Sequence, residues 1–370
     1  MENPTGEQDD RIQPVEATNQ EPTAEQRQDA DSVFSRYLLS WREAFARRRP
    51  EDQYLLDAFG RLLLKVMPRR GFLKAMGKGA LIFGATVVGV DQGLRLPELL
   101  NPEPPKITFD PDQRQYLDKE RISGVPKRAV IVFGAATVQD PSRFGTVDAL
   151  KAPFNNHDLP VGYLSYANYG LDPERTAAEL EKLKTELGVD EIIGVFQSAG
   201  FQFVAEAFSR VGDRLNLILG ILLSTPTDAS TTRFSWLINL AKAIDPVYSG
   251  GFITSGAANY QRYNNPFRRG AAGPDLAYQQ SIAIADGRHN ARLYRPRVER
   301  GEMALAFVTT ANPANDDVIY SEQSLEGLEE VLGTEIPEYP LNAGHADPAG
   351  NPEEHARVIE SILEDLLPVG

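Results

Sequence analysis

The chain has 370 residues, no cysteine and a formal net charge of −14 at pH 7. The lack of cysteine excludes disulfides, thiolate metal sites and cysteine nucleophiles. The acidic balance argues against nucleic-acid binding, because phosphate contacts require clustered cations. The first hundred residues differ in composition from the rest, which leaves about 260 residues for one sizeable domain.

Two different segments open the chain. Residues 1–30 are polar and acidic and contain almost no aliphatic side chains. Such a composition cannot bury enough apolar surface to offset the entropy lost on ordering, so we expect a disordered acidic tail. Residues 31–67 carry apolar side chains at three- and four-residue spacing, interrupted at Pro50, which predicts two amphipathic helices. These helices could dock on a partner, on a membrane face or on each other.

Residues 68–106 begin with a pair of arginines and continue into an apolar run, Ala80 to Val90. The run is shorter than the roughly 20 residues that a spanning helix needs. This pattern resembles a twin-arginine export signal, whose candidate residues are Arg69, Arg70, Phe72, Leu73 and Lys74. The resemblance implies recognition by the twin-arginine translocation machinery and an extracytoplasmic C-terminal domain.

The signal-like segment departs from the usual pattern. Pro68 stands where Ser or Thr commonly precedes the arginines, and the pair lies deep in the chain. A basic amphipathic helix followed by a buried glycine-rich helix is the alternative, and it would leave the protein in the cytoplasm. No Ala-x-Ala cleavage site follows Val90. Release and retention as a membrane anchor therefore both stay open, and a membrane is an expected partner.

Prolines between positions 97 and 105 predict a linker. Beyond it, apolar runs alternate with helical patterns, as in a parallel sheet covered by helices. Asp172 and Pro173 predict the start of a crossover helix. Residues 232–300 break the alternation and predict an inserted cap region. We expect an α/β fold over residues 107–370, a mostly parallel sheet flanked by helices. The predicted strands are Ala129 to Phe133, Val161 to Tyr166, Glu191 to Phe196, Leu215 to Leu223, Met303 to Thr309 and Ile336 to Leu341.

One serine lies at a strand-to-helix junction. The apolar strand that ends at Phe196 leads directly into Gln-Ser-Ala-Gly and then into a helical pattern. This is the shape of a nucleophile elbow, which would lift the hydroxyl of Ser198 above the sheet. The elbow needs small residues two positions to either side of the serine; Gly200 meets this need and Phe196 does not. Ser198 could otherwise be an ordinary helix N-cap.

An acid and a histidine follow the last two predicted strands. Asp316 and Asp317 come after the strand that ends at Thr309, and His345 comes after the final strand. Catalytic groups in open parallel sheets gather at the carboxyl ends of the strands. The elbow and the order serine, acid, histidine together resemble the α/β-hydrolase family, over about 107–370 of the chain.

The resemblance implies a role for each of these residues. Ser198 would be the nucleophile, His345 the general base and then acid, and Asp316 the carboxylate that orients the imidazole, with Asp317 as the alternative acid. The backbone N–H groups of Ala135 and Ala199 would form the oxyanion hole. No metal and no cofactor are expected, because the sequence contains no metal-binding motif and no phosphate loop.

The sequence thus predicts an exported or membrane-tethered serine hydrolase that cleaves an ester or similar acyl bond of a small-molecule acyl substrate. The alternative is a catalytically silent α/β-hydrolase-like scaffolding module at the membrane, favoured by Phe196 and by the N-terminal extension. Aromatic residues of the insertion could line an apolar pocket or form a small core of their own: Phe234, Trp236, Tyr248, Phe252, Tyr260 and Tyr263.

Overall fold

The computed structural model describes residues 102–117, 125–136, 138–233, 235, 238, 272, 274–312, 316, 318–342, 344–345 and 347–367. The predicted acidic tail, amphipathic helices and export signal lie outside these residues, as do Asp317 and the aromatic residues of the insertion. Among the helices in the described ranges, none has the length and apolarity needed to cross a membrane.

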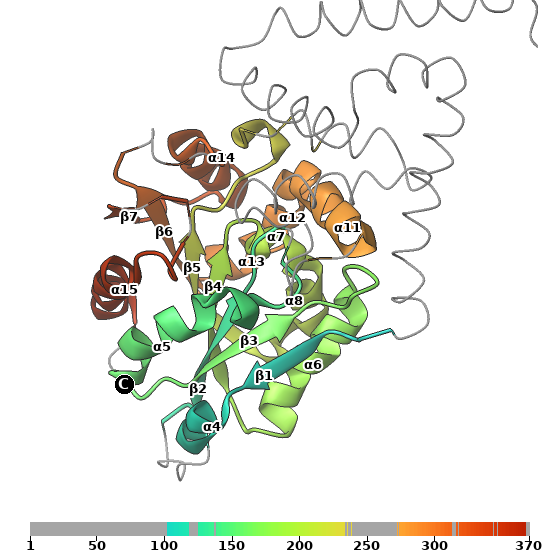
Figure 1. Ribbon diagram of the computed structural model, residues 1–370, viewed down its shortest axis with the longest axis vertical. Helices are drawn as coiled ribbons and strands as arrows, with labels where there is room; N and C mark the ends of the chain where they lie inside the picture. The colour runs from blue at the N-terminus through green and yellow to red at the C-terminus, as the bar shows by residue number, and fades with distance from the viewer. Residues whose placement is uncertain are drawn as a thin grey trace, which may run out of the picture. The chain divides into compact units, whose positions relative to one another are not determined.

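A seven-stranded sheet organises the described residues, in the order β1-β3-β2-β4-β5-β6-β7 (Figure 1). Only the edge strand β1 pairs antiparallel, with β3, whereas the other neighbours pair parallel. The predicted α/β fold with a mostly parallel sheet is therefore confirmed. The strands are β1 (Lys106–Phe109), β2 (Arg128–Phe133), β3 (Val161–Ser165), β4 (Glu191–Gln197), β5 (Asn216–Leu223), β6 (Ala304–Thr310) and β7 (Glu338–Leu341).

Helices cover both faces of this sheet, as the sequence predicts. On one face α5 and α15 pack together beside residues such as Val130 and Val132 of β2. On the other face α6, α8 and α14 pack on Ile131 and Phe133 of the same strand. Because both faces of the central strands β2 to β6 are buried, these strands are nearly continuous apolar runs. The helices with these contacts are α5 (Thr146–Asn155), α6 (Pro173–Thr185), α8 (Ala205–Val211), α14 (Ser321–Leu332) and α15 (Pro352–Leu366).

The crossover helix α6 begins where the sequence predicts. The side chain of Asp172 accepts a hydrogen bond of 3.0 Å from the backbone N–H of Arg175, and Pro173 occupies the first helical position. Proline costs nothing there because that N–H has no partner inside the helix. Leu180 and Leu183 on the inner side of the helix are buried against the sheet. A helix N-terminus of this kind is readable from the sequence because its signals are local.

An insertion separates β5 from β6, in agreement with the predicted break in alternation. Its described part includes the helices α11, α12 and α13, and α11 and α12 both contact the short helix α7 that follows β4 (Figure 1). The short elements not yet given are α4 (Pro111–Leu117), η1 (Pro141–Phe144), α7 (Gly200–Phe203), η2 (Gly212–Arg214), η3 (Ala229–Thr231), α11 (Pro274–Ala285), α12 (Gly287–Arg292) and α13 (Arg295–Glu299).

Candidate active site

Ser198 lies in a sharp turn between β4 and α7. Its φ of 51° is in the left-handed region, which costs a residue with a Cβ roughly 1–2 kcal/mol. Its N–H donates a 2.8 Å hydrogen bond to the carbonyl of Leu223 at the end of the neighbouring strand β5. The N-cap residue of α7 is Ala199, so Ser198 is not the ordinary helix cap that the sequence left open. Residues held in this backbone region cluster at functional sites.

Gly200 allows the turn to close. A Cβ at this position would lie 2.7 Å from the carbonyl oxygen of Phe133 and 3.0 Å from that of Gly134. The start of α7 therefore passes so close to the end of β2 that only glycine fits. A nucleophile elbow needs a small residue two positions after the serine because strand and helix pass close together there, and Gly200 meets this need.

Three residues from distant parts of the chain meet at the carboxyl end of the sheet. The Oγ of Ser198 lies 3.0 Å from Nε2 of His345. The other ring nitrogen, Nδ1, lies 3.0 Å from Oδ1 and 3.1 Å from Oδ2 of Asp316. These side chains follow β4, β7 and β6 respectively, and all three residues are buried. With Nδ1 protonated toward the carboxylate, Nε2 carries the lone pair that can accept the proton of the serine hydroxyl.

Asp316 has no exposed surface and is held as an acceptor. Its Oδ1 accepts backbone hydrogen bonds from Val318 at 3.0 Å and from Ile319 at 2.9 Å. Burial by itself raises the pKa of the carboxyl, but the nearby His345 ring and the two N–H groups outweigh it, so the pKa lies below its ordinary value. The ionised form thus stabilises the fold above the ordinary pKa of aspartate, and this contribution is lost as the pH falls through the lowered value.

Arg233 fixes the loop that carries Asp316, a contact that the sequence did not predict. Its side-chain Nε donates to the backbone carbonyl of Asp316 at 2.7 Å, and its backbone N–H donates to the carbonyl of Val318 at 2.7 Å. The guanidinium also lies 4.7 Å from the ring centre of Tyr320. No local pattern could reveal this role, because the arginine precedes the aspartate by 83 residues.

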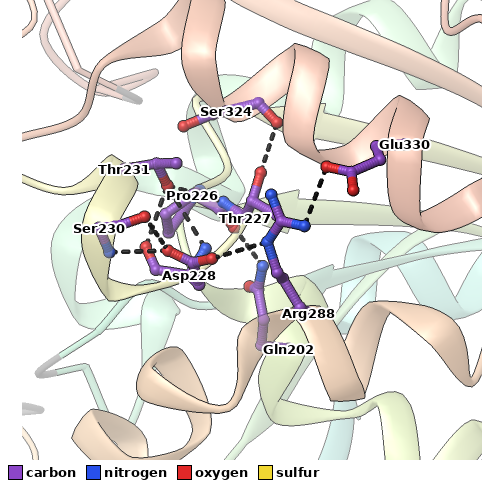
Figure 2. Close-up of polar contacts among 9 residues, drawn as sticks. All are labelled: Gln202, Pro226, Thr227, Asp228, Ser230, Thr231, Arg288, Ser324 and Glu330. Atoms are coloured by element: carbon purple, nitrogen blue, oxygen red, sulfur yellow. Dashed lines mark hydrogen bonds and ion pairs between the residues drawn. The ribbon is translucent and has the colours of Figure 1, made fainter.

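The segment after β5, which leads to Arg233, is itself held by polar contacts from the insertion and α14 (Figure 2). Arg288 of α12 bridges Asp228 at 3.0 Å and Glu330 of α14 at 2.9 Å. A Cβ at Gly287 would lie 2.1 Å from the carbonyl oxygen of Thr227, so α12 approaches this segment closely. The other residues drawn are Gln202, Pro226, Ser230, Thr231 and Ser324. The insertion therefore helps to position the loop that holds the acid.

Phe196 occupies the position two residues before the serine, where the sequence analysis expects a small residue, and the structure shows why a large one fits there. Its ring is fully buried in the core, stacked on Phe133 with ring centres 5.0 Å apart and edge-on to Phe201 at 5.2 Å. One glycine of the same strand makes room for it, because a Cβ at Gly194 would lie 2.5 Å from the ring. A large residue is tolerated before the serine because Gly194 has no side chain in its way, and this argument for a silent scaffold is removed.

We therefore expect Phe196→Ala to destabilise the protein by about 3–5 kcal/mol, because it leaves a cavity in the core. Chemical denaturation followed by circular dichroism measures this loss. Phe154→Ala, a fully buried change on the opposite face of the sheet, is the matched control and should cost a similar amount. A Phe196→Ala variant as stable as the unmodified protein would contradict the assignment of the ring to the core.

The two alanines proposed for the oxyanion hole lie at the ends of adjacent strands. Ala135 follows β2 and Ala199 follows Ser198, and the two residues are 3% and 0% exposed. Within the described part of the chain, neither backbone N–H donates a hydrogen bond to another protein group. Buried N–H groups are nearly always paired, so two unpaired ones beside a serine are available to a ligand oxygen.

The other histidines do not join this group. His157 lies 2.6 Å from Glu360 through its Nε2, and His289 is exposed on α12. His355 is buried on α15 with Nδ1 2.8 Å from the carbonyl of Asn351. Among the described residues there is also no cluster of acidic or histidine side chains suited to a metal ion.

No protein-family model matches the sequence, and a search of curated proteins found no match. Solved structures with a similar backbone include a lipase-esterase related protein from Clostridium acetobutylicum, at 9% identity and a TM-score of 0.45, covering 72% of this chain and 100% of that one. A thermophilic esterase from Thermogutta terrifontis has 15% identity and a TM-score of 0.45, covering 66% and 92%. A hydrolase from Oleispira antarctica has 13% identity and a TM-score of 0.44, covering 70% and 94%.

Proposed function

We propose that this protein is a serine hydrolase that cleaves an ester or similar acyl bond through a covalent acyl-serine intermediate. The observation that carries the proposal is the continuous hydrogen-bonded chain from the Ser198 hydroxyl through His345 to the buried carboxylate of Asp316. A serine hydroxyl is a weak nucleophile by itself and needs an adjacent base held by a third group. The chain of contacts supplies both.

The reaction follows from this arrangement. The Oγ of Ser198 attacks the acyl carbon while its proton passes to Nε2 of His345, and Asp316 stabilises the imidazolium that forms. Collapse of the tetrahedral intermediate breaks the bond to the leaving group, which takes the proton from His345. Water then attacks the acyl-serine with the same histidine as base, which releases the acid and restores the hydroxyl.

The negative oxygen of each tetrahedral intermediate needs hydrogen-bond donors that are already in place. We assign this role to the backbone N–H groups of Ala135 and Ala199. The support is that both are buried, unpaired within the described part of the chain and located at the ends of adjacent strands. Such donors cost no reorganisation during the reaction, since the sheet and the turn hold them.

Covalent labelling by a fluorophosphonate probe tests this function directly. The probe reacts with a serine only when a base has activated it, so we expect one labelled site, at Ser198, together with hydrolysis of p-nitrophenyl acetate. A catalytically silent module has no reason to activate a serine. The absence of both labelling and hydrolysis in the folded protein would refute the hydrolase and favour the scaffold.

We further propose that the protein is exported or tethered by its twin-arginine-like segment and works outside the cytoplasm. The support is the sequence pattern at Arg69 and Arg70. A receptor that reads this pair should lose it when both are changed to Lys, because lysine keeps the charge but lacks the planar guanidinium. Binding by charge alone would hardly change.

The corresponding prediction uses residues 1–105 fused to a folded reporter. We expect the unmodified fusion to leave the cytoplasm and the Arg69→Lys, Arg70→Lys double variant to stay inside, as measured by cell fractionation. Export that is indifferent to the double change, or no export of the unmodified fusion, would place the hydrolase in the cytoplasm.

A further inference from the structure

The peptide unit between Gly134 and Ala135 contains two groups that face different partners. Its N–H belongs to Ala135 and is the donor assigned above to the oxyanion hole. Its carbonyl belongs to Gly134 and accepts a buried hydrogen bond of 3.1 Å from the hydroxyl of Tyr166, which follows β3. Because a peptide unit is planar, a partner that fixes the carbonyl also fixes the direction of the N–H.

Tyr166 is well placed to act on this peptide. It is 2% exposed, and its ring packs edge-on against Phe203 of α7 with ring centres 5.8 Å apart. Burial raises the pKa of its phenol far above the ordinary value, so the hydroxyl stays protonated and acts as a hydrogen-bond donor. Its own backbone N–H donates to the carbonyl of Gln139 at 2.8 Å, which ties the far side of the same loop to β3.

We infer that Tyr166 is a positioning residue for the oxyanion hole, an inference that rests on the proposed function. The hydroxyl holds the Gly134–Ala135 peptide in one orientation. It also polarises the amide, since a carbonyl that accepts a hydrogen bond makes the N–H of the same peptide a stronger donor. Both effects favour the negatively charged intermediate over the neutral substrate. Tyr166 should therefore act on the rate of the chemical step more than on substrate binding.

A second contact holds the same loop from the insertion. The Nε2 of Gln280 on α11 donates to the carbonyl of Val138 at 3.1 Å, in a buried position. Val138 in turn donates its N–H to the carbonyl of Ala135 at 3.2 Å. The loop is thus fixed at several carbonyls, but among the described residues only Tyr166 bonds to the peptide that carries the proposed donor. This makes its hydroxyl the group to remove.

The test compares two tyrosines that make the same kind of bond. Tyr294 is 1% exposed, and its hydroxyl donates to the carbonyl of Phe201 at 3.0 Å, in a buried position. Tyr166→Phe and Tyr294→Phe each delete one buried hydroxyl and keep the ring. Both should lower thermal stability to a similar extent, since each leaves a buried carbonyl without its partner. Only the first should alter the oxyanion hole.

We expect Tyr166→Phe to lower kcat for p-nitrophenyl acetate about tenfold, with KM changed by less than about twofold. The inhibition constant of an aryl trifluoromethyl ketone, which forms a negatively charged adduct with an active serine, should rise by about the same factor as kcat falls. Tyr294→Phe should leave kcat and this inhibition constant unchanged. A rise in KM with kcat unchanged would overturn the positioning role. Equal losses of kcat in Tyr166→Phe and Tyr294→Phe would also overturn it.

If Tyr166→Phe does not fold, Tyr166→3-fluorotyrosine provides a second measurement, because the fluorinated phenol is a stronger donor of nearly the same size. It should bind the trifluoromethyl ketone more tightly than the unmodified protein, and unchanged or weaker binding would overturn the inference. An active, labelled enzyme in which Tyr166→Phe has no effect would refute this inference alone. A folded protein without labelling or turnover would refute the proposed function, and the inference with it.

Discussion

Replacing Ser198 by alanine is expected to abolish labelling by a fluorophosphonate and to lower kcat for p-nitrophenyl acetate by a factor on the order of 10⁴–10⁶. In the proposed mechanism this hydroxyl forms the acyl intermediate, and His345 and Asp316 would have no reacting partner once it is gone. The variant also loses the 3.0 Å hydrogen bond to His345, which is worth about 1 kcal/mol of stability. The fold should therefore persist, as circular dichroism would verify.

Ser209→Ala is the matched control for this change. Ser209 is exposed on α8, so its replacement removes a hydroxyl without touching the site. Labelling and turnover should both be retained in this variant. If Ser198→Ala hydrolysed the ester as fast as the unmodified protein, the nucleophile would have to be sought elsewhere, and the elbow would be only a structural turn.

The sheet was readable from the sequence because its signals are local. Five of the six predicted strands are apolar runs that lie buried between two helical layers, and the sixth, β7 at the edge of the sheet, buries only Leu341. The structure bounds each of the six within two residues of the prediction. The edge strand β1 was missed. It is four residues long, follows a proline-rich stretch and pairs on one side only. Such a strand is set by its neighbour β3 and leaves little trace in its own sequence.

The candidate site divides in the same way. Ser198, Asp316 and His345 could be proposed because each follows a strand that could itself be predicted, and the carboxyl ends of parallel strands converge. The residues that position the loops around these three side chains could not be proposed from the sequence. Arg233 and Tyr166 donate hydrogen bonds to backbone carbonyls 83 and 32 positions away, and a backbone carbonyl is present at every residue. Only the folded chain determines which carbonyl is in reach.

The placement of Phe196 required tertiary information for a different reason. The sequence shows a large ring where an elbow commonly has a small residue. It does not show that the ring turns into the core and lies over Gly194 of the same strand, where a Cβ would be 2.5 Å from it. A core tolerates a large side chain where a neighbouring position is small, so a rule about the size of one residue fails where a neighbour compensates.

Asp316→Asn is expected to lower kcat by a factor on the order of 10⁴ while leaving the site nearly the same shape. The amide oxygen of asparagine can keep the hydrogen bonds from Val318 and Ile319, which turns the NH₂ group toward Nδ1 of His345. A donor there holds Nδ1 unprotonated and places the ring proton on Nε2, which can then no longer accept the proton of the serine hydroxyl.

The neighbouring Asp317 decides between the two acids that the sequence left open. Asp317→Asn removes the same charge from the next position, so a loss caused merely by a smaller negative field should appear in both variants. We expect kcat of Asp317→Asn to stay within about threefold of the unmodified enzyme, the range of a change that leaves the tautomer of His345 intact. The initial rate of p-nitrophenyl acetate hydrolysis measures both variants under one condition. A larger loss in Asp317→Asn than in Asp316→Asn would mean that the hydrogen bond between Asp316 and His345 is not the one that orients the imidazole.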